Sequence, residues 1–246
     1  MNLNIFRNDK DNVGDANCSP TFYFDIPNTK IIDIYDKNIF DMVNKSNNII
    51  FGGGGLLVFE EKIKQILKIR NKKFITWGLG HNKHDINKIE KSKIFENFKL
   101  NGIRDFGLDI NYVPCPSCMH NSFNIKREIK YPIVVYEHKY IKIDINKFPK
   151  RNNSGNDIES VLDFLGSAET IITNSYHGAY WSILLKRKVL MIPFSSKFYG
   201  FKYKIPIVNV INWKESINKT QIYNGALEES RFLNKKYYKK VLNVLN

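Results

Sequence analysis

Short apolar runs and an amphipathic segment alternate in the first part of the chain. In residues 59–70 the apolar positions Ile63, Ile66 and Leu67 recur with the spacing of one helical face. The apolar runs of strand length each end in a glycine or a turn, and they are residues 3–6, 48–51 and 73–77. This alternation predicts an open, mostly parallel sheet, in which ligands bind beyond the carboxyl ends of the strands.

The alternation returns after a proline-rich segment that precedes residue 131. The expected elements are a strand over 131–137, a polar loop over 146–157, a capped helix over 157–168, a strand over 170–173, a turn over 174–178, a helix over 179–187 and a strand over 188–194. A final amphipathic helix is expected over residues 231–245, with Phe232, Tyr238, Val241 and Leu245 on its buried side. The chain is therefore predicted to be an α/β protein of two Rossmann-like halves with mostly parallel sheets, residues 1–125 and 126–246.

The composition supports a globular protein. The 246 residues are 43% hydrophobic, which is ample for a buried core. No run of about 18 uncharged apolar residues occurs, and the first residues lack the order of a signal peptide. We therefore expect a cytoplasmic protein.

The formal charge of +14 is compatible with nucleic acid, an anionic membrane surface or anionic substrates as partners. Only seven of the 38 basic residues are Arg, and such a surplus of Lys is equally typical of a solvated surface. The sequence has no RNP, zinc-finger or bZIP signature, and its aromatic residues are scattered, so nucleic-acid binding is not expected.

The three cysteines are an odd number in a chain without a secretion signal, which indicates reduced thiols. Cys115 and Cys118 form a CxxC pair in PCPSC, but no second pair of cysteines or histidines lies near enough to complete a zinc site. A rigid proline-containing turn is the favoured interpretation of this segment. We therefore expect neither a metal ion nor another cofactor.

The segment NVGD, residues 12–15, follows the first predicted strand. Gly14 would allow a sharp turn there, and the Asp15 carboxylate would either cap a helix or face a cleft. A plain turn explains this motif equally well.

Two glycine segments follow neighbouring strands. Gly52 to Gly55 precede a helix, and exposed amides in such a run can bind phosphate or carboxylate, whereas close packing of strand against helix is the alternative. The turn WGLG, with Gly78 and Gly80, ends the next strand. Both segments are therefore expected at the same edge of the sheet.

The remaining candidate side chains lie in GIRD and in the block over residues 170–198. Arg104 can clamp an anion with its guanidinium group, or it can form a surface pair with Asp105. His177 lies between a strand end and a helix start, where the helix dipole disfavours the imidazolium ion and stabilises anions. Ser175 and Lys197 are expected close to it.

Together and in this order, NVGD, the GGGGLL run, WGLG, GIRD and TNSYHGAYWSILLKRKVLMIPFSSKF resemble the polysaccharide pyruvyl transferase family. The resemblance spans roughly residues 3–200, and the last block is its most specific part. It implies two Rossmann-like halves similar to the GT-B glycosyltransferases. It also implies transfer of the enolpyruvyl carbons of phosphoenolpyruvate onto two hydroxyls of one sugar, which forms a cyclic ketal and releases phosphate.

On this resemblance, phosphoenolpyruvate is expected between the halves, held by Arg104, Lys197 and the glycine-loop amides. His177 would donate a proton or a hydrogen bond to the donor, and Asp15 would accept a proton from a sugar hydroxyl. The other substrate contacts would be Asn12, Gly14, Gly53, Gly54, Gly78, Gly80 and Ser175. The acceptor would be a saccharide intermediate of a cell-surface polymer, either free or lipid-linked, and a lipid-linked acceptor would bring the protein to the inner face of the membrane.

One position departs from the family pattern. Characterised members often have an Arg shortly before the motif His, where this chain has Ser175. Lys197, Arg104 or a different donor substrate would have to compensate for that Arg. A glycosyltransferase that uses a nucleotide sugar on the same architecture is therefore the alternative, and the released product, phosphate or nucleotide, distinguishes the two.

Overall fold

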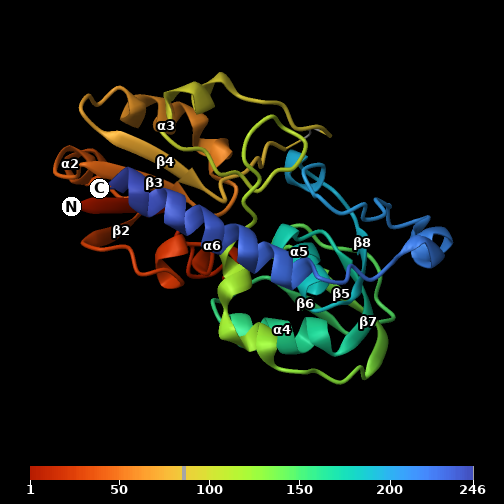
Figure 1. Cartoon of the computed structure of the whole chain (residues 1–246). Coiled ribbons are helices and arrows are strands. Elements are labelled where there is room, and N and C mark those ends of the chain that lie inside the picture. Colours follow the sequence, from red (N-terminus) through yellow and green to blue (C-terminus); the bar gives the residue numbers. More distant parts are fainter. Residues whose placement is uncertain (85–86, 246) are drawn as a thin grey trace.

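The computed structural model describes residues 1–84 and 87–245, which form two parallel four-stranded sheets (Figure 1). The first sheet has the order β2-β1-β3-β4 and the second has the order β6-β5-β7-β8, so both halves place their first strand between the second and the third. The strands are β1 (Asn2–Phe6), β2 (Thr29–Asp33), β3 (Asn48–Gly52), β4 (Lys73–Trp77), β5 (Tyr131–Glu137), β6 (Lys150–Asn152), β7 (Ala168–Thr173) and β8 (Lys188–Met191). The α/β class with parallel sheets is therefore confirmed.

Helices connect the strands within each half. They are α1 (Val13–Ala16), α2 (Ile39–Asn44), α3 (Glu60–Leu67), α4 (Ile158–Gly166), α5 (Tyr176–Leu184) and the C-terminal α6 (Ala226–Leu245). In α3 the predicted apolar face is buried at Ile63 and Ile66. Helix α4 begins as predicted, because the Asp157 side chain accepts a hydrogen bond of 3.1 Å from the Ser160 amide.

The structure corrects three features of the predicted pattern. Strand β2 and helix α2 were not expected, because β2 has largely polar or exposed positions and α2 has only six residues. The predicted polar loop over 146–157 contains the short strand β6, whose polar side chains suit a sheet edge. The predicted turn over 174–178 is mostly helix, since Ser175 caps α5 and Tyr176 is its first residue.

Helix α6 runs across both halves (Figure 1). Its Asn234 side chain accepts a hydrogen bond of 2.8 Å from the Trp77 indole, and its Tyr237 hydroxyl donates to the Thr76 carbonyl over 2.6 Å. Towards its N-terminus, Arg231 Nε donates to the Cys118 carbonyl over 2.9 Å, in the segment that leads into the second half, and the helix also contacts α5. The helix therefore joins the end of β4 to the second half.

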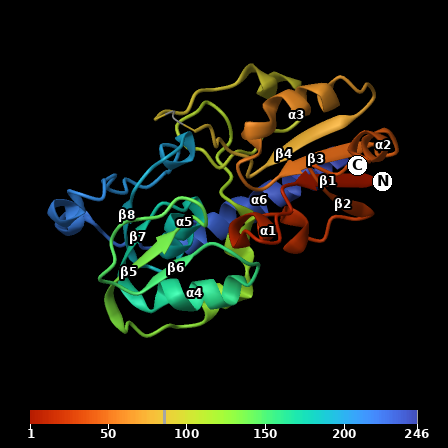
Figure 2. The same ribbon diagram turned by 180° about the vertical axis from the view of Figure 1, so that it is seen from behind.

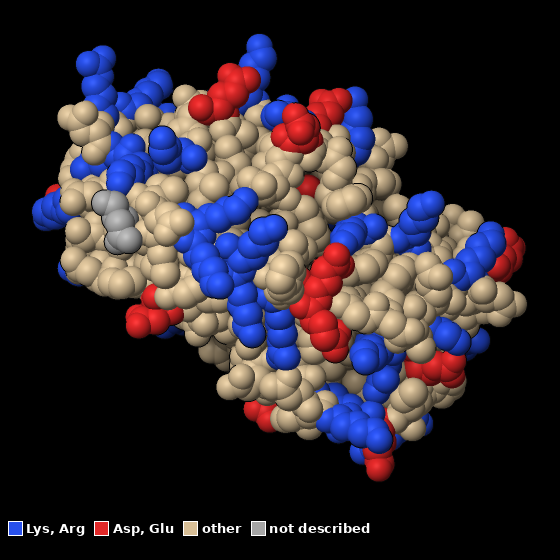
Figure 3. Space-filling model, viewed as in Figure 1, with Lys and Arg blue, Asp and Glu red and all other residues tan. Residues whose placement is uncertain are grey.

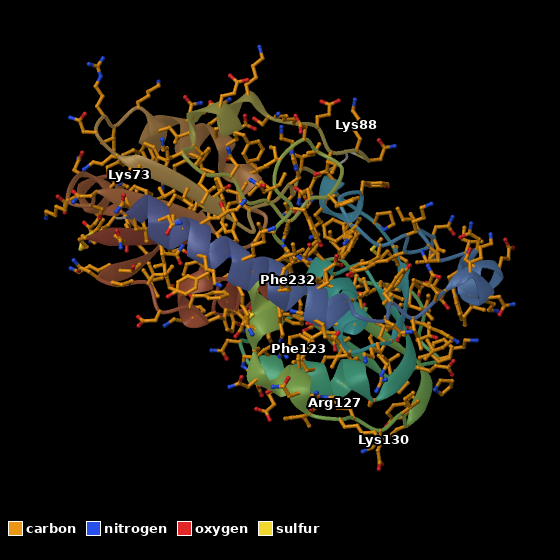
Figure 4. All side chains as sticks on the ribbon, in the orientation of Figure 1. Lys73, Lys88, Phe123, Arg127, Lys130 and Phe232 are labelled. Carbon is orange, nitrogen blue, oxygen red and sulfur yellow. The ribbon has the colours of Figure 1, made fainter. Side chains whose placement is uncertain are left out.

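The buried face of α6 differs from the predicted one. Val241 is buried as predicted, and Tyr238 and Leu245 are partly buried, but Phe232 is 63% exposed on the outer side of the helix (Figure 4). The buried face instead contains Ser230, Asn234 and Tyr237. Apolar periodicity does not detect this face, because hydrogen-bonded polar side chains occupy much of it.

The two halves share a hydrophobic core. Phe6, Val13 and Cys18 of the first half pack in the same buried cluster as α4 and α5 of the second. All three cysteines are free and buried, as the odd number predicts, and the CxxC segment forms a short 3-10 helix (Pro116–Met119). Part of the apolar surface of each half is therefore buried only against the other half.

Basic side chains spread over the face of the molecule that carries α6, with acidic side chains among them (Figure 3). On α6 the exposed lysines are Lys235, Lys236, Lys239 and Lys240. None of the helices in the described ranges has the length and apolarity needed to cross a membrane.

Candidate active site

The carboxyl ends of the central strands of both sheets meet at one cavity of about 170 Å³. In each sheet the strand order reverses beside the first strand, and the crevice outside such a switch point is where α/β proteins bind ligands. Figure 2 shows α1, which follows β1, where the two halves meet. The cavity is lined by Asp9, Asn12, Asp15, Gly55, Asn82, Arg104, His138, Lys139, Tyr140, Asn153, Ser175, Tyr176, His177 and Lys197.

The structure brings six of the predicted site residues together around this cavity. They are Asn12, Asp15, Arg104, Ser175, His177 and Lys197. The predicted glycines do not line it, and they are Gly14, Gly53, Gly54, Gly78 and Gly80. The sequence therefore predicted which side chains line the cavity, but not which glycines do.

The NVGD segment forms the first turn after β1. Asn12, rather than Asp15, caps α1, because its Oδ1 accepts a hydrogen bond of 3.2 Å from the Gly14 amide. Its Nδ2 donates to Asp15 Oδ2 over 2.9 Å, which orients the carboxylate that lines the cavity. A side chain at Gly14 would place its Cβ 2.0 Å from His177 Nδ1, so only glycine lets the histidine lie there.

The Asp15 carboxyl group lies in a low-dielectric position between the halves. Burial raises its pKa to about 6, although the nearby Lys197 and Arg104 charges act in the opposite direction. Its only side-chain hydrogen bond within the described ranges comes from Asn12. This carboxyl group can therefore hold or release a proton near neutral pH.

Arg104 is a buried cation without an anionic partner among the described residues. The residue is 2% exposed. Its guanidinium group forms no hydrogen bond and no ion pair with any described residue. The group lies 3.8 Å from the centre of the Tyr176 ring and packs against Gly80, where a Cβ would lie 2.4 Å from Nε. A buried, rigid and unpaired guanidinium group is suited to binding an anionic ligand.

The predicted surface pair of Arg104 with Asp105 does not form. Asp105 is 1% exposed and instead accepts hydrogen bonds from the His81 amide, over 2.7 Å, and from His81 Nδ1, over 2.6 Å. The carboxylate therefore holds the segment after β4 in place and leaves Arg104 directed elsewhere.

Lys197 is the second buried cation of the cavity. The residue is 8% exposed, its Nζ lies 4.3 Å from the centre of the Phe194 ring, and it has no ion pair in the part of the chain that is described. Burial, together with the Arg104 charge, lowers its pKa to about 7, while Asp15 acts in the opposite direction. An anion bound beside it would stabilise the ammonium form.

His177 lies in the first turn of α5 and lines the same cavity. Burial and the charges of Arg104 and Lys197 lower its pKa well below the ordinary value, so the imidazole is neutral. Its Nε2 lies 3.4 Å from the Cys115 thiol, and its ring packs against Trp181 with the two ring centres 5.0 Å apart. Ser175 caps the helix by accepting a hydrogen bond of 3.2 Å from the Gly178 amide.

The glycine run does not serve uniformly as an anion-binding loop. The Gly53 amide donates to the Trp77 carbonyl over 3.0 Å, and the Gly80 amide donates to the Gly54 carbonyl over 3.0 Å, so neither is available to a ligand. The amides of Gly54 and Gly55 have no such acceptor within the described ranges, and Gly55 lines the cavity. The Gly53 amide is therefore not free for a ligand in this structure, and Gly55 rather than Gly53 lines the cavity.

Gly78 also has a structural position. Its φ of +65° is one that residues with a side chain rarely adopt, and its amide donates to the Gly102 carbonyl over 2.9 Å. A Cβ there would lie 3.0 Å from Pro116 Cδ. The residue thus lets the chain turn closely past the PCPSC segment and does not contact the cavity.

The sequence analysis missed several residues that line the cavity, among them residues 138–140. They follow β5 directly, which is the same relation that NVGD has to β1, and this position was a signal that they face the cavity. Lys139 Nζ lies 3.3 Å from carboxylate oxygens of both Asp9 and Asp11, so it links the two halves. Lys139 is therefore neutralised, unlike Arg104 and Lys197.

The described residues contain no group of His, Cys, Asp and Glu side chains that could hold a metal ion. The chemistry that this site can perform with its own groups consists of anion binding, by Arg104 and Lys197, and proton transfer, by Asp15.

Comparison with known proteins supports the fold alone. No known protein family and no curated protein sequence matches this chain. Among solved structures, a functionally uncharacterized protein from Klebsiella pneumoniae subsp. pneumoniae is similar, with a TM-score of 0.51 and 14% sequence identity over 85% of this chain and 93% of that one. The similarity extends over both halves, so the arrangement of two parallel sheets is shared with that protein.

Proposed function

We propose that the protein is a pyruvyl transferase that uses phosphoenolpyruvate as its donor and a saccharide as its acceptor. The observation that supports this most is the pair of buried cations, Arg104 and Lys197, which face one small cavity and form no ion pair with a described residue, although Asp15 lines the same cavity. Leaving such charges unpaired is costly unless a ligand compensates them. Phosphoenolpyruvate carries a phosphate and a carboxylate, and the two cations can each take one of these groups.

The proposed reaction joins two acceptor hydroxyls to one donor carbon. The donor methylene carbon takes up a proton and becomes a methyl group, and the two sugar oxygens bond to the neighbouring carbon as its bond to the phosphate oxygen breaks. Of the two hydroxyl protons released, one balances the proton on the methyl group and the other leaves with phosphate. No oxidant, reductant or metal ion is needed for this balance.

Asp15 is the group proposed to move these protons. Its pKa of about 6 allows the carboxylate to accept a proton from a sugar hydroxyl and to pass a proton on near neutral pH. His177 is neutral, so we assign it a hydrogen bond to the donor in place of proton donation from an imidazolium ion. The cations and the hydrogen bond would stabilise the charge that develops on the leaving phosphate.

A GT-B-like arrangement is part of the same proposal. In it the donor would occupy the cavity between the two halves, and the acceptor would enter from the side of His138 and Tyr140. The exposed Tyr140 ring, with 77% of its surface accessible, offers an apolar surface to a sugar ring.

The test is incubation of the purified protein with phosphoenolpyruvate and a panel of saccharides, in which phosphate release and a ketal product are followed together. We expect both with at least one saccharide in wild type, and at a low phosphoenolpyruvate concentration we expect both to be much slower in an Arg104→Met variant. Phosphate release without a ketal would indicate hydrolysis and would contradict the proposal. Turnover of a nucleotide sugar with nucleotide release would establish a glycosyltransferase instead.

A further inference from the structure

Four buried side chains behind the cavity form a continuous series of hydrogen bonds that ends on His177. Trp181 Nε1 lies 2.9 Å from Ser117 Oγ, Ser117 Oγ lies 3.2 Å from Cys115 Sγ, and Cys115 Sγ lies 3.4 Å from His177 Nε2. Trp181, Ser117 and Cys115 are fully buried. The chemistry of these four groups fixes the direction in which the hydrogen bonds run.

The direction of the hydrogen bonds is fixed at Trp181, because an indole N–H can only donate. Ser117 Oγ therefore accepts from Trp181, and its own hydrogen must point to another acceptor. Within the described ranges the only acceptor within reach of this hydroxyl is Cys115 Sγ. If the thiol instead donated to Ser117, the hydroxyl hydrogen would be buried without a partner, which costs roughly 1–3 kcal/mol.

The only acceptor within reach of the Cys115 thiol hydrogen, among the described residues, is then His177 Nε2. Burial raises the pKa of the Cys115 thiol, so the group keeps its hydrogen and can donate it. A nitrogen that accepts a hydrogen bond carries no proton in a neutral imidazole, so the proton of His177 must be on Nδ1.

Nδ1 is the ring nitrogen that remains for a ligand, because His177 lines the cavity and its Nε2 faces Cys115. Nδ1 lies close against Gly14, where a side chain would have its Cβ only 2.0 Å away, and it makes no hydrogen bond to a described residue. We infer that Trp181, Ser117 and Cys115 hold His177 as the neutral Nδ1–H tautomer, which presents an N–H donor to an anionic group in the cavity. The three residues are positioning residues, since they act through His177.

This inference rests on the proposed function only for the identity of the anionic group, which would be the phosphate or carboxylate of phosphoenolpyruvate. It also restricts the role of His177. A neutral imidazole that accepts at Nε2 and donates at Nδ1 is a hydrogen-bond donor to the ligand and has no free nitrogen with which to act as a base.

The tautomer is measured on the wild-type protein, without substrate, by NMR correlation of the imidazole nitrogens with the ring protons. Spectra at about pH 8 keep ordinary imidazoles neutral, and the His177 signals are those lost in a His177→Asn variant. Two other histidines provide internal references for the opposite tautomer, with the proton on Nε2. His120 Nδ1 accepts from the Ser122 amide over 3.3 Å and His138 Nδ1 accepts from the Tyr140 amide over 3.3 Å, so both must carry the proton on Nε2.

We expect the Nδ1–H pattern for His177 and the Nε2–H pattern for both references. A wild-type His177 with its proton on Nε2 would overturn the inference, whatever reaction the protein catalyses. Because this measurement involves no turnover, failure of the inference and failure of the proposed function are distinguishable.

Variants of Cys115 test whether the series of hydrogen bonds is the cause. Cys115→Ala removes the donor to Nε2, so we expect a mixture of tautomers and a fall in kcat of about tenfold or more, with a smaller change in the donor KM. Cys115→Ser restores a donor at the same place and should recover most of the Nδ1–H signal. Retention of the pure Nδ1–H tautomer in Cys115→Ala, or in Ser117→Ala if the first variant does not fold, would show that these residues do not set it.

Discussion

Arg104 owes its position to contacts that only a flat guanidinium group satisfies. It stacks 3.8 Å above the centre of the Tyr176 ring, and Gly80 leaves the space that its Nε occupies. Lysine has neither the planar shape that stacks on Tyr176 nor the fixed pair of donors that binds a carboxylate or phosphate with two parallel hydrogen bonds. The arginine is therefore a binding residue in our interpretation, rather than part of an internal ion pair.

Replacement of Arg104 by Met should raise the donor KM by about tenfold or more, because one charge-assisted hydrogen bond contributes roughly 1.5–3 kcal/mol. The acceptor KM should change less. Arg70→Met is the matched control, since Arg70 is exposed on the surface and should leave both constants unchanged. An Arg104→Met enzyme with wild-type donor kinetics would exclude this residue from the donor site.

Lys197 should make donor binding depend on pH. Its pKa of about 7 is depressed by burial and by Arg104, so the ammonium form is complete below this pH and is lost above it. The affinity for phosphoenolpyruvate should therefore be highest below about pH 6 and fall between about pH 7 and pH 9. Ionisation of Asp15, with a pKa of about 6, adds a negative charge to the cavity and acts in the same direction.

Calorimetric titration of phosphoenolpyruvate into wild type and into Lys197→Met separates these contributions. The variant should bind more weakly at low pH and lose the decline above about pH 7, while the step from Asp15 remains. Ionisation of the ligand itself is common to both proteins and cancels in the comparison. Identical pH profiles for the two proteins would remove Lys197 from the anion site.

At the scale of elements, the glycine run after β3 combines two different roles. Gly53 has a φ of +71°, and a Cβ there would lie 1.8 Å from the Cys18 carbonyl oxygen. Gly55 has an ordinary φ of −85° and lines the cavity, with a Cβ expected 2.7 Å from Asn82 Cβ and 3.4 Å from an Arg104 nitrogen. The first glycine is needed for its backbone conformation and for packing, and the second for the close approach of two residues that line the cavity.

Gly53→Ala should lower the free energy of unfolding by about 3 kcal/mol or more, because backbone strain and a clash add together. Gly107→Ala is the control for strain alone, since Gly107 has a φ of +90° with nothing near its Cβ position, and it should cost about 1 kcal/mol. Gly55→Ala should change stability less than Gly53→Ala does and weaken donor binding. The experiment compares urea unfolding with phosphoenolpyruvate titration, and native donor affinity in Gly55→Ala would mean that the whole run only packs.

At the scale of the whole molecule, α6 and the shared core make the two halves one folding unit. Asn234 is fully buried, where it accepts from the Trp77 indole and its Nδ2 donates to the Pro114 carbonyl over 3.1 Å. This side chain connects the helix to the end of β4 and to the PCPSC segment. Since the cavity requires both halves, the contacts of α6 bear on the geometry of the site from outside it.

Asn234→Ala should destabilise the protein by about 2–4 kcal/mol, because it leaves the buried indole N–H without an acceptor. Phe232→Ser, on the exposed side of the same helix, should stay within about 0.5 kcal/mol of wild type. Both variants should unfold in urea in a single transition seen equally by far-UV and near-UV circular dichroism. An Asn234→Ala protein as stable as the Phe232→Ser protein would show that the helix contributes little to joining the halves.

The sequence by itself determined the elements whose cause is local. Short apolar runs marked the places of six of the strands, although the last of them ends at Met191 and not at residue 194, and Asp157 marked the start of α4. The rule that ligands bind beyond the carboxyl ends of parallel strands, together with the family resemblance, selected Asp15, Arg104, His177 and Lys197, which all line the cavity. The same rule reached Ser175, whose short polar side chain is typical of a helix cap.

Only the tertiary structure decided which partners these residues have. It directed Asp105 to His81 and left Arg104 unpaired, and it placed Gly55 rather than Gly53 at the cavity. It also placed the Asn234 side chain of α6 against Trp77, and the Trp181 series behind His177, where residues far apart in the chain meet. Periodicity reports how one segment divides its surface between core and solvent, whereas a hydrogen bond between distant side chains depends on how the segments are packed, and no local pattern contains that information.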